Sequence, residues 1–414
     1  MGDLLFLAHR IPYPPDKGDK IRSWNILKYV AERAPVHLGA FVDDPEDMKH
    51  ADFLASVCKS VKLIPMDPKD RLKRAWAGWR KGEALSISLF DDRAMKRWVW
   101  DRVKQHDIDR MFVFSSQMAP YALGHTSQGR RMVMDFVDID SDKFAQYAKE
   151  SRWPKSWLYA REAKLLQSFE KQVARHVDVS LFVSDAETAM FKRIAGSYAH
   201  TVDTLHNGVD LDYFSPSADF APLGDEAGIG AGPKLVFTGA MDYRPNADAV
   251  CWFADAILPL IRKRYPQARF FIVGGKPTPE VQALGSREGI IVTGRVPDVR
   301  PYVAAADVAV APIRIARGVQ NKVLEAMAMA RPVVATDAAW SGIDAEPERD
   351  LLVRDDAAAF AAGVCAVLED PALGTRLSES GRRQVESRYA WSAQLAKLDG
   401  WLGLGAADPK VEAA

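Results

Sequence analysis

Cysteine is scarce in this chain of 414 residues. Its three cysteines, Cys58, Cys251 and Cys365, are odd in number and lie far apart. That arrangement excludes a disulfide framework, and its spacing matches no zinc-ligand pattern. A reducing compartment is therefore expected, and we predict a cytoplasmic protein.

An excess of charge of one sign is also absent. The chain has 55 Lys and Arg residues and 55 Asp and Glu residues, so its formal net charge is zero. A polycation that recruits nucleic acid by counterion release is thereby excluded. An anionic partner must meet a local basic patch instead.

Long hydrophobic runs and one glycine motif are missing too. No run reaches about 18 apolar residues, the length that spans a bilayer. The opening run Leu4–Ala8 is too short for a signal-peptide core and is expected to form a first buried strand. No Gly-x-Gly-x-x-Gly opens a helix after a strand, which excludes a nicotinamide-dependent oxidoreductase.

Short apolar runs alternate with amphipathic stretches through the first half. This rhythm predicts parallel strands that are covered on both faces by helices. The predicted strands are Leu4–Ala8, Val36–Val42, Val61–Met66, Met111–Ser115, Met132–Val137 and Val179–Val183. Pro and Gly then cluster in a linker at about 215–233, after which the rhythm restarts.

In the second half, three predicted strands end in glycine. They are Lys234–Gly239, Arg269–Gly275 and Gly289–Gly294. Glycine after a strand permits a tight turn or a close approach of the backbone to a ligand, although each could also be an ordinary turn. The fold class predicted is α/β, with two Rossmann-like, doubly wound parallel-sheet domains that face a central cleft.

The segment Gly318–Met327 places a glycine loop, Lys322 and Glu325 around one helix start. Unpaired backbone N–H groups and a lysine suit a diphosphate, and a glutamate one turn further on can accept hydrogen bonds from a ribose diol. The helix could instead be plain core with Glu325 on its solvated side. The apolar strands predicted on either side favour a ligand site.

Several motifs together resemble the GT-B glycosyltransferases of family 4, also called glycosyl transferases group 1. They are Leu205–Phe214, Phe237–Gly239, Val273–Gly275, Thr293–Val296, Ala306–Val308 and Leu324–Met327. The segment Ile11–Arg22 resembles a bacterial branch associated with exopolysaccharide assembly. The resemblance covers nearly all of the chain.

The resemblance implies retaining transfer of a sugar from a nucleoside diphosphate sugar to an acceptor, with no cofactor and no metal. UDP or GDP is the expected nucleotide. Residues 1–205 would form the acceptor-side domain and 206–385 the donor-binding domain. A helix around Tyr389–Leu402, within 386–414, would pack back on the first domain before a disordered tail.

In the family pattern, Glu325 binds the donor ribose, Val296 faces the base and Gly18 lies against the donor phosphates. The full set of predicted donor-binding residues is Gly18, Gly239, Gly275, Arg295, Val296, Arg317, Gly318, Asn321, Lys322 and Glu325.

The chain departs from the family pattern in three places. Arg317 stands where a first glutamate is common, which leaves the donor sugar open. The usual Arg and Lys are replaced within Ala240–Asn246, and Lys322, Arg314 or Arg317 could supply that charge. We favour Lys322 because it lies at a helix N-terminus. A histidine near the sugar is replaced by the acidic run around Asp138.

Asp138 and His9 are the catalytic candidates, since both follow predicted strands. Asp138 could accept the proton of an acceptor hydroxyl or orient the sugar. His9 could instead be structural. Asp138 and Asp140 also spell the Asp-x-Asp of metal-dependent GT-A transferases, a rival that the second Rossmann-like half disfavours. We assign Asp19 to a helix N-cap.

Two other functions stay open from the sequence. A sugar-nucleotide epimerase uses the same two-domain fold, and a non-catalytic sensor would bind a nucleotide sugar without transferring it. Only a transferase requires an acceptor, and a sensor yields no product.

Residues 69–82 carry six basic residues, one acid and two tryptophans. Such a helix suits an anionic membrane surface, but it could also be a solvated helix whose tryptophans pack on its own domain. Membrane contact would fit a polyprenyl-diphosphate-linked acceptor at the inner membrane face; a glycan acceptor is the other option. Lys17, Lys20 and Arg22 could meet a phosphate of either substrate.

Overall fold

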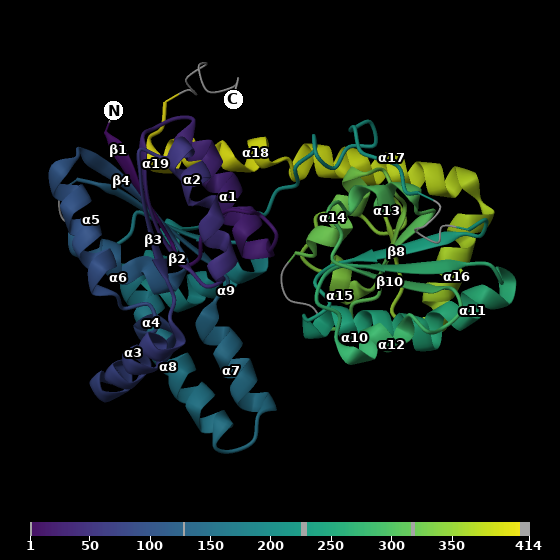
Figure 1. Cartoon of the computed structure of the whole chain (residues 1–414), viewed down its shortest axis with the longest axis horizontal. Helices are drawn as coiled ribbons and strands as arrows, with labels where there is room; N and C mark the ends of the chain where they lie inside the picture. The colour runs from purple at the N-terminus through teal and green to yellow at the C-terminus, as the bar shows by residue number, and fades with distance from the viewer. Residues whose placement is uncertain (1, 127–128, 225–229, 316–318, 406–414) are drawn as a thin grey trace. The chain divides into compact units, whose positions relative to one another are not determined.

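The computed structural model describes residues 2–126, 129–224, 230–315 and 319–405. The chain divides into two units, one comprising the described residues of Met1–His206 and Leu395–Ala414, the other Asn207–Gln394. Each unit contains one parallel sheet (Figure 1). The predicted pair of doubly wound parallel-sheet domains is therefore confirmed.

The first unit is built on a seven-stranded sheet with the order β3-β2-β1-β4-β5-β6-β7. Its strands are β1 (Asp3–Ala8), β2 (Val36–Val42), β3 (Ser60–Pro65), β4 (Ile108–Phe114), β5 (Arg131–Val137), β6 (Val179–Phe182) and β7 (Val202–Thr204). All residues of β1 and β2 are buried, as expected for parallel strands covered on both faces.

Ten α-helices accompany this sheet in the part of the chain that the structure describes. They are α1 (Gly18–Ala31), α2 (Ala51–Val57), α3 (Pro68–Lys81), α4 (Leu85–Ser88), α5 (Arg93–Gln105), α6 (Ala119–Ala122), α7 (Asp140–Glu150), α8 (Lys155–Ala174), α9 (Asp185–Ala195) and α19 (Lys397–Leu402). Short 3₁₀ turns span Pro45–His50, Ser116–Met118, Leu123–His125 and Gly196–Thr201.

The second unit holds a six-stranded parallel sheet with the order β10-β9-β8-β11-β12-β13. Its strands are β8 (Lys234–Thr238), β9 (Arg269–Val273), β10 (Ile290–Gly294), β11 (Val308–Ala311), β12 (Val333–Ala335) and β13 (Leu352–Val353). The strand order reverses between β8 and β11, and such a switch point is where open α/β sheets bind ligands.

Helices cover both faces of this second sheet, with α13 and α14 on one side and α10, α11 and α12 on the other (Figure 1). The helices are α10 (Arg244–Trp252), α11 (Leu258–Arg264), α12 (Pro279–Leu284), α13 (Arg300–Ala305), α14 (Asn321–Ala328), α15 (Asp337–Trp340), α16 (Ala357–Glu369), α17 (Pro371–Arg388) and α18 (Trp391–Leu395). A π-helical turn, Phe253–Ile257, joins α10 to α11.

The C-terminal segment differs from the single helix predicted around Tyr389–Leu402. Residues 386–388 complete α17, whose buried Val385 packs in the second core, and two short helices, α18 and α19, follow. Helix α19 is held within the first unit, where Tyr29 donates to Asp399 (2.9 Å) and Arg110 donates to the carbonyl of Gly403 (3.1 Å). The predicted disordered tail, 406–414, lies outside the described residues.

In the described ranges, no single helix is both long enough and apolar enough to cross a bilayer, and only α16 and α17 taken together, bent by 102°, meet that test.

Candidate functional site

The strand-end glycines of the second unit meet at the carboxyl edge of its sheet. The N–H of Gly239 donates to Val273 (3.0 Å), and the N–H of Gly274 donates to Gly294 (3.2 Å). The N–H of Met241 donates to the carbonyl of Gly275 (2.9 Å). The predicted common edge of β8, β9 and β10 is therefore confirmed.

Gly274 is required here by close approach. A Cβ atom built on Gly274 would lie 1.7 Å from the carbonyl oxygen of Gly239, far inside any real contact. The turn after β9 can therefore press against the turn after β8 only because Gly274 has no side chain.

Lys322, in the first turn of α14, reaches across the switch point to the turn after β8. Its ammonium donates to the side-chain oxygens of Asn246 (3.0 Å) and Gln320 (3.3 Å). Asn246 is itself held by donating to the carbonyl of Ala240 (2.9 Å). Both acceptors of Lys322 are neutral amides, so among the described residues no carboxylate pairs with this cation.

Glu325 lies one turn further along α14 than Lys322. Leu324 and Met327 on either side are buried in the core, whereas Glu325 is only half-buried. Within the described ranges its carboxylate makes no hydrogen bond or ion pair. The apolar face of α14 thus packs as core, and its remaining face presents an unpaired carboxylate.

Burial moves the pKa values of both charged groups toward the neutral form. Burial lowers the pKa of Lys322 to about 8, and the negative charge of Glu325 opposes the shift. Burial raises the pKa of Glu325 to about 7, and Lys322 opposes that shift. An incoming diphosphate would restore full protonation of Lys322, because an opposite charge favours the charged form.

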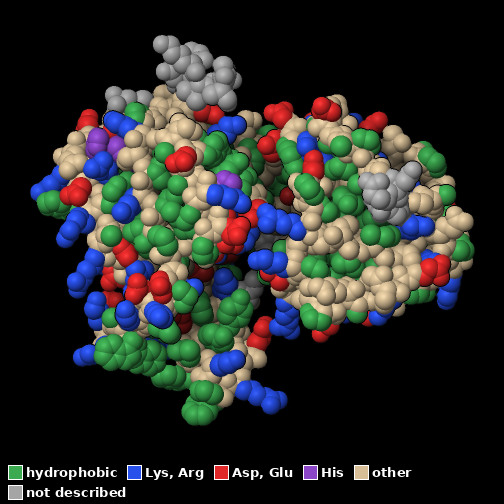
Figure 2. Space-filling view, in the orientation of Figure 1, with side chains coloured by type: hydrophobic (Ala, Val, Ile, Leu, Met, Phe, Trp, Pro, Cys, Tyr) green, Lys and Arg blue, Asp and Glu red, His purple; other side chains and the backbone are tan. Residues whose placement is uncertain are grey.

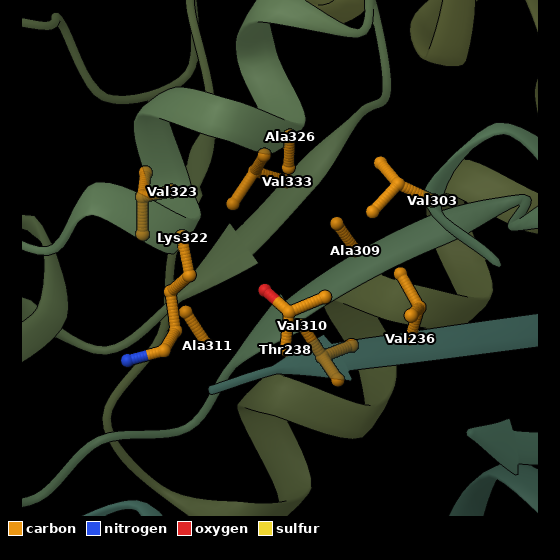
Figure 3. Close-up of a pocket in the computed structure, with 10 residues that line it drawn as sticks. All are labelled: Val236, Thr238, Val303, Ala309, Val310, Ala311, Lys322, Val323, Ala326 and Val333. Atoms are coloured by element: carbon orange, nitrogen blue, oxygen red, sulfur yellow. The ribbon is translucent and has the colours of Figure 1, made fainter. Parts of the chain in front are cut away.

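A small apolar gap lies beneath Lys322, between the sheet and α14 (Figure 3). Figure 3 shows the nitrogen of Lys322 pointing away from the apolar side chains of Val236, Val303 and Val333. The gap has a volume of about 10 Å³, which is no more than a single water requires. A nucleotide therefore cannot enter this gap. The candidate site is instead the carboxyl edge of the second sheet, where Lys322 and Glu325 lie.

Other predicted donor-binding residues lie near this edge. Arg295 and Val296 directly follow β10, and the Cβ of Arg295 is 3.4 Å from a Cβ built on Gly275. Asn321 begins α14, and its buried side-chain oxygen has no hydrogen-bond partner among the described residues.

Arg317 and Gly318 lie outside the described residues. Arg314 is paired with Asp248 through two contacts (3.0 and 2.6 Å).

Two basic residues near Gly18 form ion pairs with carboxylates of the same unit. Lys20 is buried between Asp16 (3.1 Å) and Asp47 (2.8 Å). Arg22 is buried against Asp135 (2.8 Å). The hypothesis that these two cations meet a substrate phosphate is therefore wrong. Gly18 itself faces open space, since a Cβ there would contact nothing within 4 Å.

Asp19 is not the N-cap of α1, because α1 begins at Gly18 with Lys17 as its cap. Its carboxylate instead pairs with Arg10 and lies 3.5 Å from Nε2 of His9. Those partners lower the pKa of Asp19 to about 2 against the opposing effect of burial. The ring of His9 stacks on Phe114 (centroids 5.8 Å apart), so this histidine is fixed on two sides.

Asp138 follows β5 at the carboxyl edge of the first sheet and its side chain is exposed. The residue before it, Val137, has a φ of 68°, which is a strained conformation for a β-branched residue. The N–H of Val183 donates to Val137 (2.9 Å) and holds this turn in place. Backbone strain of this kind is typical of positions that serve a site.

Glu187, in the first turn of α9, faces Asp138. One of its oxygens accepts from the N–H of Ile139 (3.3 Å), and the other is buried without a hydrogen-bond partner among the described residues. Burial and then the charge of Asp138 raise the pKa of Glu187 to about 8. Burial of the carboxyl group by neighbouring atoms raises the pKa of Asp138 as well; Lys143 opposes the shift and Asp140 adds to it. The two groups thus hold fewer than two negative charges at neutral pH.

Asp140, the second acid of the Asp-x-Asp pattern, accepts from Ser116 (3.1 Å) and Gln117 (3.4 Å). The two parallel sheets contradict the GT-A rival that this pattern raised.

Residues 232–370 match the family model described as glycosyl transferases group 1. The chain is 28% identical over 244 residues to a GDP-mannose-dependent phosphatidylinositol monomannoside mannosyltransferase of Mycolicibacterium smegmatis. That alignment covers 55% of this chain and 63% of the relative, less than two thirds of its length. A lipopolysaccharide core mannosyltransferase of Rhizobium leguminosarum is 27% identical, with coverage of 60% and 71%.

Solved structures share the fold over nearly the full length. Anabaena Alr3699/HepE in complex with UDP has a TM-score of 0.69 at 14% identity, with coverage of 97% and 99%. WaaG, a glycosyltransferase of lipopolysaccharide biosynthesis, has a TM-score of 0.65 at 17% identity, with coverage of 97% and 100%. The GT-B fold and the resemblance to glycosyl transferases group 1 are confirmed.

Sequence reasoning missed two residues of these edges. Asn246 accepts a hydrogen bond from Lys322. The sequence signal for its role was its place in the first turn of α10, the helix that follows the strand-end glycine Gly239. Glu187 belongs to the pattern Ser-x-x-Glu from Ser184, which predicts a helix start. The N–H of Glu187 donates to the hydroxyl of Ser184 (3.3 Å), as that pattern predicts. The carboxylate of Glu187 also accepts from the N–H of Ile139, a contact that only the fold reveals.

Proposed function

We propose that this protein is a glycosyltransferase that transfers a sugar from a nucleoside diphosphate sugar to a glycan or a lipid-linked acceptor. The observation that carries the proposal is Lys322, a cation held by two neutral amides at the start of α14, with Glu325 one turn further on. The group 1 family match covers this region.

Each part of the edge has a role in the proposal. Lys322 and the start of α14 bind the diphosphate and stabilise its charge as it leaves. Glu325 accepts hydrogen bonds from the ribose, and Val296 faces the base. Because Lys322 and the N–H groups at the start of α14 can stabilise the leaving group, we propose that no metal is required. Transfer with retention is carried over from the family resemblance.

Asp138 is the proposed proton acceptor or sugar-orienting group on the first unit. Its strained turn and its partner Glu187 support a functional role. His9 is the weaker candidate, because Asp19 and Phe114 fix its ring as a structural histidine would be fixed.

The acceptor and the biological setting are proposed from the relatives. The two named mannosyltransferases act in phosphatidylinositol mannoside and lipopolysaccharide core synthesis. We propose a cell-surface or exopolysaccharide glycan, assembled on a polyprenyl-diphosphate carrier at the cytoplasmic face of the membrane.

Transfer assays test this proposal directly. GDP-mannose and UDP-glucose are each incubated with a polyprenyl-diphosphate-linked saccharide, with and without EDTA, and the anomeric configuration of any product is determined by NMR. We expect an acceptor-dependent, EDTA-resistant product with retained configuration. Conversion of the donor without acceptor would indicate an epimerase, binding without any product would indicate a sensor, and loss of turnover in EDTA would contradict the metal-free site.

A further inference from the structure

Large apolar side chains are exposed together on one surface of the first unit. Helix α3 presents Leu72, Trp76 and Trp79, which are spaced by four and three residues and so share one face. The start of α8 and the turn before it present Trp157 and Trp153. Exposed fractions are 74% for Leu72, 63% for Trp76, 82% for Trp153 and 56% for Trp157.

The two helices that carry this surface are fixed to each other. The rings of Trp79 and Trp157 pack edge to face with centroids 5.8 Å apart, and the guanidinium of Arg161 lies 4.2 Å from the Trp79 ring. Glu162, buried in α8, accepts from the N–H groups of Leu85 (2.9 Å) and Ser86 (2.8 Å). The α3–α4 turn is thereby anchored to α8, so the surface is preformed.

Trp79 thus packs in part on its own domain, as expected for the solvated helix, although 40% of it stays exposed. Leu72, Trp76, Trp153 and Trp157 are exposed to solvent. Figure 2 shows hydrophobic side chains gathered over α3 and over the tip of the α7–α8 hairpin, with basic side chains among them.

The charge of this surface is strongly positive. Residues 69–83 and 147–164 contain nine exposed basic residues and three exposed acids, and one of those acids, Asp70, is paired with Lys73 (3.2 Å). The basic residues are Lys69, Arg71, Lys73, Arg80, Lys81, Lys149, Arg152, Lys155 and Lys164. Two copies of this surface would repel each other, so the charge disfavours self-association.

We propose that this aromatic and basic surface docks on an anionic lipid bilayer. Tryptophan settles at the boundary between headgroups and acyl chains, and lysine and arginine attract anionic headgroups. Helices α3 and α7 follow the carboxyl ends of β3 and β5, so the surface extends from the sheet edge that carries Asp138. Docking would hold that edge close to a lipid-linked acceptor.

The inference goes beyond the proposed sugar transfer, because docking requires neither a nucleotide nor turnover. A failure of the docking test therefore leaves nucleotide binding untouched, and the reverse also holds.

Co-sedimentation with vesicles tests the docking. Vesicles of phosphatidylcholine alone and of phosphatidylcholine mixed with phosphatidylglycerol are compared for the wild-type protein and the double variant Trp76→Ser/Trp153→Ser. We expect selective binding to the anionic vesicles that weakens with salt, and a loss of about tenfold or more in the variant. Both substitutions are at exposed positions, and an unchanged circular dichroism spectrum confirms folding.

Trp100→Ser is the matched control, since Trp100 is half-exposed beside a basic residue, Lys104 (3.6 Å), but lies on α5. It should bind vesicles as the wild type does. Equal losses in the control and the double variant, full binding by the double variant, or no preference for anionic lipid would overturn the proposal. So would a dimer in analytical ultracentrifugation that the double variant abolishes, because the surface would then serve a second copy.

Discussion

Lys322 is charged at neutral pH without a carboxylate to pair with in the described structure. A carboxylate beside a lysine competes with an incoming anion for its charge, whereas amide oxygens orient an ammonium and add no opposing charge. Arg314 shows the contrast, because Asp248 satisfies its guanidinium. The favoured choice of Lys322 over Arg314 as the diphosphate ligand thus has a physical basis, although it stays a prediction.

The affinity for a nucleotide sugar should depend on pH on both sides of neutrality. Below about pH 7 Glu325 gains a proton and no longer accepts two hydrogen bonds, and above about pH 8 Lys322 loses its charge. We expect the dissociation constant, measured by calorimetry with a nucleotide sugar, to be lowest between these values. Nucleotide sugars suit the measurement because their diphosphate does not titrate in this range.

Two variants distinguish the acid side of this pH dependence of the dissociation constant from its alkaline side. Glu325→Gln should remove the dependence on the acid side, and Lys322→Arg should remove it on the alkaline side, because a guanidinium stays protonated. A flat profile for the wild-type protein would show that these two groups do not bind the ligand.

Gly274→Ala should destabilise the second unit. The added methyl group would meet the carbonyl oxygen of Gly239 at 1.7 Å, and overpacking of this kind costs about 1 to 3 kcal/mol or more. Chemical denaturation measures the loss. Gly18→Ala, which meets open space, is the control and should change the free energy of unfolding by less than about 0.5 kcal/mol. Equal effects of the two substitutions would contradict this packing.

At the scale of elements, the turn after β5 and the start of α9 are hydrogen-bonded to each other and together carry the acidic residues Asp138 and Glu187. The N–H of Ile139 binds Glu187, and the carbonyl of Val137 accepts from Val183 after β6. The two strand ends are thereby tied together around Asp138, and the strain at Val137 is maintained by these contacts.

Glu187→Gln should stabilise the protein more at pH 8 than at pH 5. The pKa of Glu187 is raised in the folded state from an ordinary value of 4.5 to about 8, so the wild-type protein loses stability as pH rises between these values. A neutral glutamine avoids that loss, by about 1 to 3 kcal/mol. Thermal unfolding at both pH values measures the difference.

Glu150→Gln, at the exposed end of α7, is the matched control and should show no such change between the two pH values. An effect of Glu187→Gln that is the same at pH 5 and pH 8 would mean that this carboxyl is not buried against Asp138.

Most strands could be predicted from the sequence because short apolar runs between amphipathic stretches are typical of buried parallel strands. The six strands expected in the first half all form within a few residues of the predicted bounds. Strands β7 and β13 were not predicted, because their three and two residues are too few to show a hydrophobic pattern. The N-cap assigned to Asp19 failed because its carboxylate pairs with Arg10, which lies outside the local sequence.

At the scale of the whole molecule, sequence pattern located the glycine-rich edge of the second sheet more completely than the edge of the first sheet that carries Asp138. Glycines at strand ends necessarily share one edge of a parallel sheet, so Gly239, Gly274 and Gly294 could be grouped beforehand. The pairing of Lys20 with Asp47 and of Arg22 with Asp135 joins distant segments, and no spacing rule anticipates it. Those pairs removed two predicted phosphate ligands.

The central claim is that α14 binds a nucleoside diphosphate through Lys322 and Glu325, and calorimetric titration with UDP, GDP and their sugars tests it most directly. We expect one nucleotide to bind, and Glu325→Ala to weaken it by about 1.5 to 3 kcal/mol, roughly ten- to hundredfold in affinity. Glu379→Ala, which removes an exposed glutamate of α17, should bind as the wild type does. Unchanged affinity in Glu325→Ala, or no binding of any nucleotide, would contradict the claim.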